Sequence, residues 1–269
     1  MKKSLFKIWA VLNLTPDSFY PESRVTHKDF VNRCVECLSQ GADVLDIGAE
    51  STRPFSQALG FREEWDRLEA PLTDLRLEIG QSEFSKRVSI DTYKAETAQK
   101  VLELGVGFIN DVSGGKSSEL LKLTAQYDAG IVLMHSRGEP ADMQVNPQYT
   151  DVGIEILEFL RMQSEKAIHC GVAKNKIIWD VGIGFGKLLE HNLQLLKNTD
   201  IFRSDGFPLM VGISRKSFID KLLNIPSAEQ RRDPTIIINT YLALHQVDIL
   251  RVHDIKDADL IRKIIQHLI

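Results

Sequence analysis

Short apolar runs alternate along the chain with segments of helical periodicity. About eight such runs are present, and most end on a polar or charged residue. Runs of this length, bounded by turn residues, are typical of buried strands. We expect strands at residues 8–12, 44–47, 88–90, 108–109, 131–134, 177–179 and 209–213, and around Val252.

Helical patterns fill the intervals between these runs. We expect helices over residues 28–39, 61–79, 95–104, 119–127, 152–170, 188–196, 217–223, 236–245 and 258–268. Gly80, Gly105 and Gly171 directly follow three of them, as glycine commonly does at a helix C-terminus. A strand followed by a helix, repeated about eight times, predicts a parallel sheet covered by helices.

The polar strand endings decide between two parallel architectures. An open doubly wound sheet gathers its ligand residues at one switch point, whereas here nearly every predicted strand carries a polar end. The pattern therefore predicts an α/β fold: a (β/α)8 TIM barrel of eight parallel strands with outer helices, forming a single domain over residues 1–269. Its site is expected at the C-terminal ends of the strands.

Composition limits the class of protein but does not indicate a function. The chain has 43% hydrophobic and 26% charged residues, close to an ordinary globular domain. A net charge of -4 provides no basic footprint for nucleic acid, and no apolar stretch is long enough to predict a membrane span. The N-terminus lacks a signal-peptide pattern, so a cytoplasmic location is expected. Cys34 and Cys37 fall within a predicted helix, where burial is favoured over a redox or zinc site.

Three interior runs end on carboxylate or amide side chains. An acid that points into a barrel mouth is costly to bury unless it binds something. Asp91, Asn110 and Asp180 together suit a flat heterocycle with paired N–H donors. Each residue alone could cap the next helix, but this explanation is weaker for all three.

Glycine and basic residues follow several other runs. Residues 48–54 and 214–217 combine small residues with Arg or Lys groups suited to phosphate. Gly182–Lys187 lacks the spacing of a P-loop or a dinucleotide fingerprint, and its phenylalanine is suited to stack on a flat ligand. Arg251 and His253 alternate onto one strand face. A structural loop would explain each segment singly; together they predict a heterocycle deep in the barrel and a phosphate or diphosphate at the rim.

Eight segments, in this order, resemble dihydropteroate synthase of folate biosynthesis. They are residues 13–19, 50–54, 91–92, 109–111, 133–135, 184–187, 214–217 and 251–254. The family is a (β/α)8 barrel, in agreement with the pattern above. The resemblance implies condensation of 6-hydroxymethyl-7,8-dihydropterin diphosphate with p-aminobenzoate, giving 7,8-dihydropteroate and pyrophosphate.

The resemblance also implies a role for each matching residue. The implied pterin ligands are Asp91, Asn110, Met134, Asp180, Phe185 and Lys216. The implied diphosphate ligands are Asn13, Thr52, Arg53, Arg251 and His253, and Asn13 would also meet the cofactor Mg²⁺. The residues implied to close over p-aminobenzoate are Thr15, Pro16, Phe19, Pro54, Arg215 and Ser217. The expected catalytic residues are Asp91, Lys216, Arg251 and His253, and a homodimer is expected through helices late in the barrel.

Three features depart from the family pattern. Tyr20–Arg24 replaces the usual Ser-Asp-Gly-Gly, Val181 replaces a proline, and Ser136 replaces a common methionine. The first and third look like features of sulfonamide-insensitive members, so drug sensitivity is open. Three alternatives to the synthase are also open: a pterin-binding paralogue without synthase activity, a pterin-dependent methyltransferase, and a phosphate-binding barrel lyase.

Overall fold

Eight parallel strands close into a barrel in the computed structural model, which describes residues 5–14, 27–50, 59–138 and 147–268. The strands are β1 (Lys7–Asn13), β2 (Val44–Gly48), β3 (Val88–Asp91), β4 (Phe108–Asp111), β5 (Gly130–Met134), β6 (Ile177–Asp180), β7 (Leu209–Val211) and β8 (Ile249–Val252). Each pairs with the next along the chain, and β8 returns to pair with β1. The predicted (β/α)8 barrel is confirmed.

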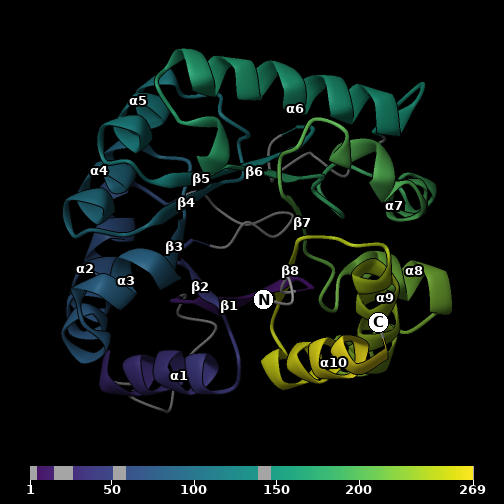
Figure 1. The fold of residues 1–269 in the computed structure, drawn as a ribbon, viewed down its shortest axis with the longest axis horizontal. Helices are drawn as coiled ribbons and strands as arrows, with labels where there is room; N and C mark the ends of the chain where they lie inside the picture. Colours follow the sequence, from purple (N-terminus) through teal and green to yellow (C-terminus); the bar gives the residue numbers. More distant parts are fainter. Residues whose placement is uncertain (1–4, 15–26, 51–58, 139–146, 269) are drawn as a thin grey trace.

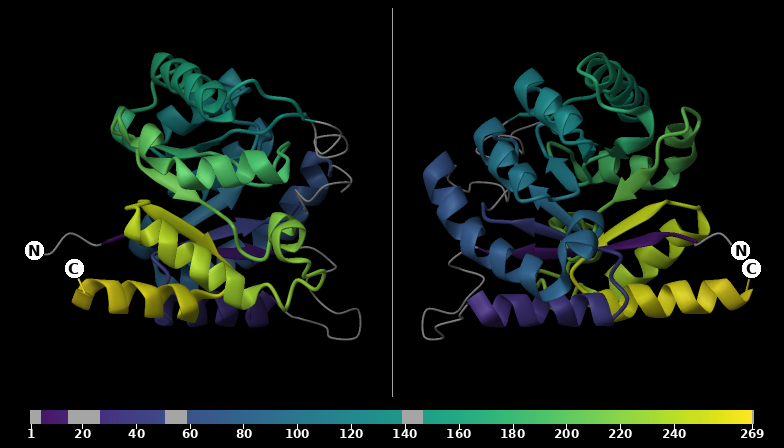
Figure 2. Two further views of the ribbon diagram at one scale, coloured as in Figure 1. Left: turned by 90° about the vertical axis from the view of Figure 1, so that its right-hand side faces the viewer. Right: turned by 60° about the vertical axis from the view of Figure 1, so that its left-hand side comes forward.

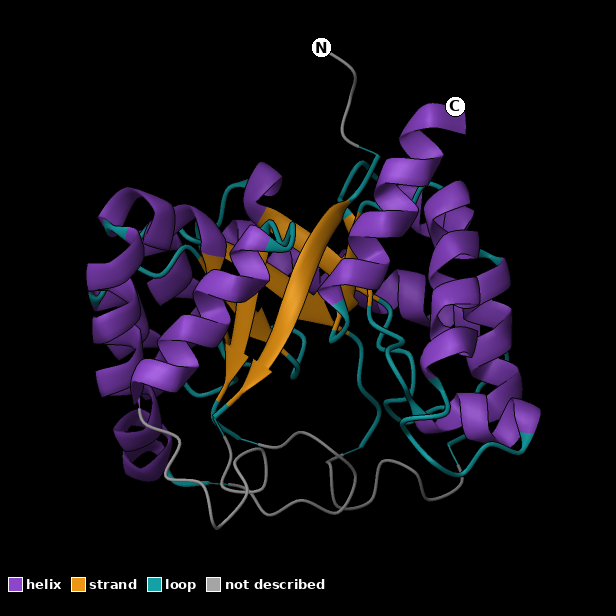
Figure 3. Cartoon of the chain, turned by 90° about the horizontal axis from the view of Figure 1, so that it is seen from below, coloured by secondary structure: helices purple, strands orange, loops and turns teal. Residues whose placement is uncertain are grey.

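Helices surround the strands on the outside of the barrel (Figure 1, Figure 3). They are α1 (His27–Ser39), α2 (Phe61–Ile79), α3 (Gln81–Arg87), α4 (Ala95–Glu103), α5 (Ser118–Gln126), α6 (Val152–His169), α7 (Leu189–Lys197), α8 (Ser217–Leu223), α9 (Arg232–Leu244) and α10 (Ile255–Leu268), with short 3-10 helices at Lys174–Lys176 and Thr199–Arg203. The first and last helices lie side by side (Figure 2), where Arg262 of α10 donates to the carbonyl of Gly41 at 2.7 Å. Among the described residues, no helix is both long and apolar enough to cross a membrane.

Several predicted boundaries are wrong, and one helix was not predicted. Helix α3 was not predicted, because Gly80 ends α2 and the seven residues after it form a separate helix before β3. Helix α9 begins at Arg232 rather than at Ile236, since Pro234 fits the first turn of a helix, and α10 begins at Ile255 rather than at Ala258. Strand β7 ends at Val211 rather than at Ile213.

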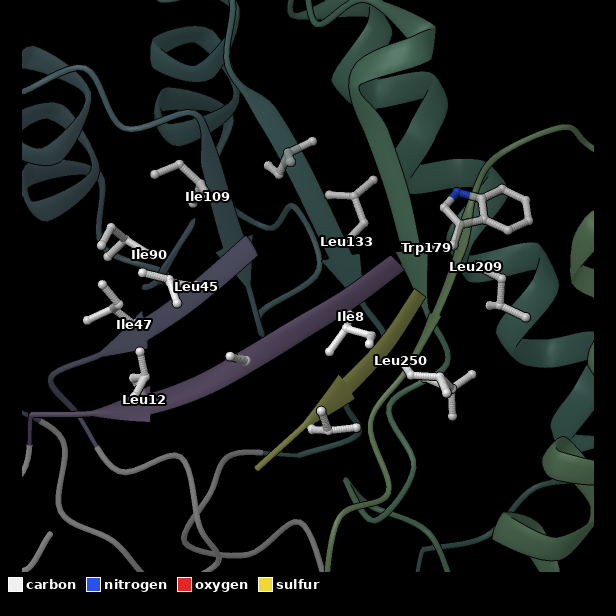
Figure 4. Packing of buried hydrophobic residues seen from close by; sticks show 14 of the residues in the cluster. Ile8, Leu12, Leu45, Ile47, Ile90, Ile109, Leu133, Trp179, Leu209 and Leu250 are labelled. Carbon is white, nitrogen blue, oxygen red and sulfur yellow. The ribbon is translucent and has the colours of Figure 1, made fainter. Parts of the chain in front are cut away.

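The outward faces of the strands form the main hydrophobic core. Ile8, Leu45, Ile90, Ile109 and Leu133 alternate outward, are fully buried, and pack beneath the helices (Figure 4). Burial of apolar surface at about 25 cal/mol per Å² makes this layer the main stabilising element. Cys34 and Cys37 of α1 belong to the same core, and burial raises the pKa of both thiols, as their place in a helix predicted.

A second, smaller apolar cluster fills the inside of the barrel. It consists of Trp9, Val44, Val132, Ile178, Met210 and Ile249, with Phe108 packed against it. The rings of Trp9 and Phe108 meet edge to face with centroids 5.2 Å apart. The interior is therefore a packed floor rather than a pore, and any ligand site must lie above it, at the C-terminal strand ends.

Candidate active site

Polar side chains replace the apolar ones in the layer directly above the barrel floor. Register places Asp91 beside Asn110 on neighbouring strands, and Met134 beside Asp180 two strands further on. Asp91, Asn110 and Asp180 are nine-tenths or more buried. Because all strands run parallel, these ends meet at one side of the barrel. The sequence-predicted groups are thus brought together by the topology.

Arg251 of β8 connects opposite parts of this layer. Its Nε donates to Asp46 Oδ2 at 2.6 Å, and its Nη2 donates to Asp91 Oδ2 at 2.9 Å. Asn110 Nδ2 donates to the same Asp46 oxygen at 2.9 Å. One guanidinium and one amide are therefore held by two carboxylates in a single buried network. Charge-assisted bonds of this kind are among the strongest in proteins.

Asp46 is a site residue that the sequence interpretation overlooked. It lies inside residues 44–47, a run that is otherwise apolar and predicts a buried strand. Strand alternation could have found it: Leu45 and Ile47 point outward to the core, so Asp46 points inward beside Ser89, its register partner. The side chain is fully buried.

Several buried polar atoms in this layer have no partner among the described residues. They are Asp46 Oδ1, Asp91 Oδ1 and Asn110 Oδ1, together with Ser89 Oγ and Trp9 Nε1. An unpaired buried acceptor costs about 1–3 kcal/mol. The free oxygens of Asp91 and Asn110, at the strand ends, are therefore suited to a ligand that brings N–H donors, which is the chemistry of an amino-substituted heterocycle.

Asp180 and Lys216 form the other side of the pocket. Asp180 Oδ1 accepts from the Gly182 N–H at 2.8 Å. Lys216 Nζ donates to the Ile183 carbonyl at 2.5 Å and lies 4.6 Å from the centroid of the Phe185 ring. Phe185, which the sequence suited to stacking on a flat ligand, and Lys216, which the resemblance assigns to the pterin, are thus in contact with each other.

The glycine at position 182 is required by the local backbone. Its φ is +65°, and a Cβ there would lie 1.9 Å from the His135 carbonyl oxygen. A side chain would therefore force the turn after β6 away from the pocket. Glycine here lets the chain pass close to β5 and return toward the barrel mouth.

Burial shifts the charges of the pocket toward neutrality. Burial raises the pKa of Asp91 to about 7, with Arg251 opposing the shift and Asp46 adding to it. Burial lowers the pKa of Lys216 to about 8, while the charge of Asp180 opposes that shift. The pKa of Asp180 is also raised, chiefly by burial. Perturbed groups of opposite sign in one pocket mark a candidate functional site.

Some of the predicted rim residues lie within the described part of the chain. Arg215, at φ +56°, donates to both carboxylate oxygens of Asp254, at 3.1 and 2.9 Å. Ser217 begins α8 and His253 follows β8, and both are exposed. Asn13 ends β1 beside Gly48. The predicted Thr15, Pro16, Phe19, Thr52, Arg53 and Pro54 lie outside the described residues.

His135, the polar ending of the fifth predicted strand, pairs with a buried lysine. It follows Met134, packs edge-on against Phe159, and lies 3.0 Å from the amine of Lys187. Lys187 also donates to the Phe185 carbonyl at 2.9 Å. Burial lowers the pKa of His135 to about 2 and that of Lys187 well below its usual value. The His135–Lys187 pair therefore supports the loop that carries Phe185.

A buried ion cluster supports the end of β2. Lys94 pairs with Glu50, the last residue described before position 51, and with Glu64 of α2 at 3.1 Å. Tyr93 donates to Glu50, and Thr97 donates to Glu64 at 2.6 Å. Burial opposes the charge of Lys94, but the bond to Glu50 and both carboxylate charges raise its pKa above the usual value. The sequence interpretation did not identify this cluster, since its members are far apart in the chain.

Comparison with known proteins places this arrangement in a family. The sequence model of the family described as pterin binding enzyme matches residues 9–253. The chain belongs to this family. The pterin binding enzymes similar to it include the dihydropteroate synthase of Neisseria meningitidis serogroup B, which is 36% identical over 260 residues, 93% of this chain and 88% of that protein.

Two solved pterin binding enzymes share the fold over nearly the whole chain. Dihydropteroate synthase from Anaplasma phagocytophilum with bound 6-hydroxymethylpterin-monophosphate has a TM-score of 0.87 and 35% identity, covering 98% of this chain and 100% of that one. Dihydropteroate synthase from Xanthomonas albilineans with 4-aminobenzoic acid has a TM-score of 0.89 and 31% identity, covering 98% and 93%. At these identities the similarity extends beyond the barrel to the family.

Proposed function

We propose that the protein is a dihydropteroate synthase, which joins 6-hydroxymethyl-7,8-dihydropterin diphosphate to p-aminobenzoate and releases pyrophosphate. The observation that carries the proposal is Asp91, whose Oδ2 is held by Arg251 while its buried Oδ1 has no partner in the described chain. Family membership and relatives named dihydropteroate synthase support the same conclusion. The ligands of the two solved relatives correspond to the two proposed substrates.

The buried polar layer would hold the pterin. Asp91, Asn110 and Asp180 accept hydrogen bonds from its N–H groups, and Lys216 donates to a ring oxygen or nitrogen. Met134 and Phe185 pack on the two faces of the ring. This assignment is supported by the free acceptor oxygens of Asp91 and Asn110 and by the contact of Lys216 with the Phe185 ring.

The reaction exchanges one bond for another at the exocyclic methylene. The C–O bond to the diphosphate breaks, the aniline nitrogen forms a C–N bond, and that nitrogen loses one proton. Arg251 and His253, with Thr52 and Arg53, would stabilise the charge that grows on the leaving diphosphate. Asp91 would stabilise the positive charge that develops on the methylene.

The residues present fit a magnesium ion that is held mainly by substrate. Mg²⁺ takes hard oxygen ligands, keeps several waters, and often binds through substrate phosphates with only one or two protein groups. Asn13 offers such an oxygen at the end of β1. The described residues hold no cluster of three or more His, Cys, Asp or Glu side chains suited to a metal. When bound, the ion would neutralise charge on the diphosphate.

The p-aminobenzoate site would form at the rim. Arg215 and Ser217 lie after β7, where they would join Thr15, Pro16, Phe19 and Pro54 around the second substrate. The carboxylate of Asp254 pairs with Arg215 in two hydrogen bonds. A carboxylate substrate could take the place of Asp254, since a guanidinium fork suits any carboxylate.

We also propose a homodimer through α9 and α10 and a cytoplasmic location. A cavity of about 150 Å³ between these helices is lined by Ile236, Thr240, Asp257, Leu260, Ile261, Ile264 and Ile265. Leu260 and Ile264, which line this cavity, are at least half exposed. An apolar surface of this kind is suited to a second copy of the chain.

A pyrophosphate-release assay with both substrates and Mg²⁺ tests the proposed activity. We expect release only when pterin diphosphate and p-aminobenzoate are present together. Pterin binding without release would favour the silent paralogue, and methyl transfer from a methylfolate would favour the methyltransferase. A sulfonamide added to the same assay tests whether the altered Tyr20–Arg24 segment and Ser136 reduce inhibition.

A further inference from the structure

A single oxygen atom of Asp46 serves two residues of the proposed pterin pocket. Asp46 Oδ2 accepts from Arg251 Nε at 2.6 Å and from Asn110 Nδ2 at 2.9 Å. Asp46 is fully buried on β2, below the strand ends where the ligand would sit. It therefore acts on the pocket through its two neighbours.

The bond to Asp46 fixes the amide of Asn110 in one orientation. The Asn110 amide nitrogen is committed to Asp46, so its Oδ1 faces elsewhere and has no partner in the described chain. A half-turn of the amide would set its oxygen against the Asp46 carboxylate, and two acceptors repel each other. Asn110 is thus held as an acceptor rather than a donor.

The second bond fixes Arg251 and, through it, Asp91. With Nε on Asp46, the planar guanidinium directs Nη2 to Asp91 Oδ2 at 2.9 Å. Asp91 Oδ1 is then the oxygen left without a partner. Asp91 and Asn110 are register neighbours, so their two free oxygens belong to adjacent strands of the pocket.

We propose that Asp46 is a positioning residue that sets the hydrogen-bonding polarity of the pocket, making Asn110 and Asp91 present acceptors side by side. The pocket then selects a ring edge with adjacent N–H donors and rejects an edge that presents acceptors. This inference deepens the proposed function and rests on it.

Stability alone does not explain a carboxylate at this position. Buried ion pairs are often no more stabilising than apolar residues of similar volume. Asp46 Oδ1 also has no partner among the described residues, and a buried unpaired oxygen needs an explanation. A role in orienting Arg251 and Asn110 through Oδ2 accounts for a carboxylate here despite the cost of the unpaired Oδ1.

The test is a double-mutant cycle with Asp46→Asn, Asn110→Asp and the combined swap, each measured for 6-hydroxymethylpterin binding by calorimetry. Asn110→Asp sets two carboxylates against each other, and we expect it to weaken binding at least roughly tenfold. The swap restores a donor facing an acceptor at the same net charge, so we expect it to recover most of that loss. If the effects of the two single substitutions on the free energy of pterin binding simply add in the combined swap, the proposal is overturned.

Asp46→Ala removes the shared acceptor and should weaken pterin binding roughly tenfold or more, with p-aminobenzoate KM little changed. Wild-type pterin affinity in this variant, or equal losses for both substrates, would overturn the proposal. Asp43→Ala is the matched control. Asp43 pairs with Arg262 at 2.7 Å just before the start of the same strand, far from the pocket layer. It should leave pterin affinity unchanged.

The same measurements separate this inference from the proposed function. If the wild-type protein binds 6-hydroxymethylpterin but releases no pyrophosphate, the synthase proposal is wrong. The double-mutant cycle can still be interpreted, because it measures pterin binding alone. A wild-type protein that turns over, with an additive cycle, would overturn only the role of Asp46. If Asp46→Ala fails to fold, the isosteric swap still decides the question.

Discussion

At the scale of single residues, the pocket contains ionisable side chains whose charged forms are destabilised by burial. Asp91 has a pKa of about 7 and Lys216 a pKa of about 8, both displaced by burial toward the neutral form. A ligand that supplies hydrogen-bond partners would restore the charged forms. Substrate binding and ionisation of these two side chains are therefore coupled.

The first prediction is a narrow pH optimum for kcat/KM of the pterin substrate. Asp91 is protonated as the pH falls below about 7, and Lys216 loses its proton as the pH rises above about 8, so activity should decline on both sides. A pH–rate profile measures both limbs. Lys216→Arg should move the alkaline limb beyond the range of Lys216, and an unchanged limb would contradict its assignment.

The second prediction concerns the chemical role of Asp91. Asp91→Asn keeps an acceptor at the same place but removes the charge proposed to stabilise the methylene cation. We expect kcat to fall by about two to three orders of magnitude while pterin affinity falls far less. Steady-state kinetics together with pterin calorimetry measure the two effects. An equal fall in both would assign Asp91 to binding alone.

Polar residues that follow an apolar run could be predicted from the sequence, whereas Asp46, which lies inside such a run, was missed. Asp91, Asn110 and Asp180 follow apolar runs, and parallel topology alone brings such ends together. Asp46 was hidden by the apolar residues around it. Lys187 and His135 are 52 residues apart in the chain, and only the tertiary structure shows that they pair.

At the scale of elements, the strand ends are fixed by contacts between helices and loops. Lys94, before α4, neutralises Glu50 at the end of β2 and Glu64 in α2. The carboxylates are nine-tenths or more buried, and Lys94 is 13% exposed. The junction therefore depends on one cation shared by two acids.

The third prediction is that Lys94→Met strongly destabilises the fold. Removing the cation leaves two buried carboxylates without compensation, so we expect a loss of about 3–5 kcal/mol in the free energy of unfolding. Urea denaturation measures it. Lys100→Met is the control, because Lys100 pairs with Glu103 on the exposed face of α4 and should cost roughly 0.5 kcal/mol or less. Similar losses of unfolding free energy in both variants would show that the buried cluster contributes no more stability than the exposed ion pair.

Helices with clear periodicity and glycine stops were predictable, and those without were not. Helix α2 begins and ends at the predicted residues, because Gly60 and Gly80 flank an acidic first turn and an apolar stripe. Helix α3 is short and polar, with Phe84 as its one buried residue, so no periodic pattern indicated it. The packing of α3 against its neighbours, rather than a pattern in its sequence, fixes its place between α2 and β3.

At the scale of the whole molecule, the interior of the barrel consists of two layers with different roles. The apolar floor around Trp9 closes the interior, and the polar layer with Asp91 and Arg251 lies above it. The overall topology was predictable because strand–helix repetition admits few alternatives. The partition into floor and pocket was not, since it depends on the inward register of every strand.

The fourth prediction is a dimer that depends on α10. Ile264→Glu places a charge on the apolar surface around the α9–α10 cavity and should convert the protein to a monomer. Sedimentation velocity measures the mass. Leu77→Glu, at an exposed apolar position on α2, should leave the mass unchanged. A monomeric wild-type protein would contradict the proposed dimer.

The most direct test of the account is to quantify both products of one reaction mixture. Pterin diphosphate, p-aminobenzoate and Mg²⁺ are incubated with the wild-type protein, and pyrophosphate and 7,8-dihydropteroate are measured together. The account predicts equal amounts of the two products, none without either substrate, and almost none with Asp91→Asn. Pyrophosphate formed without p-aminobenzoate, or no dihydropteroate from protein that binds the pterin, would contradict it.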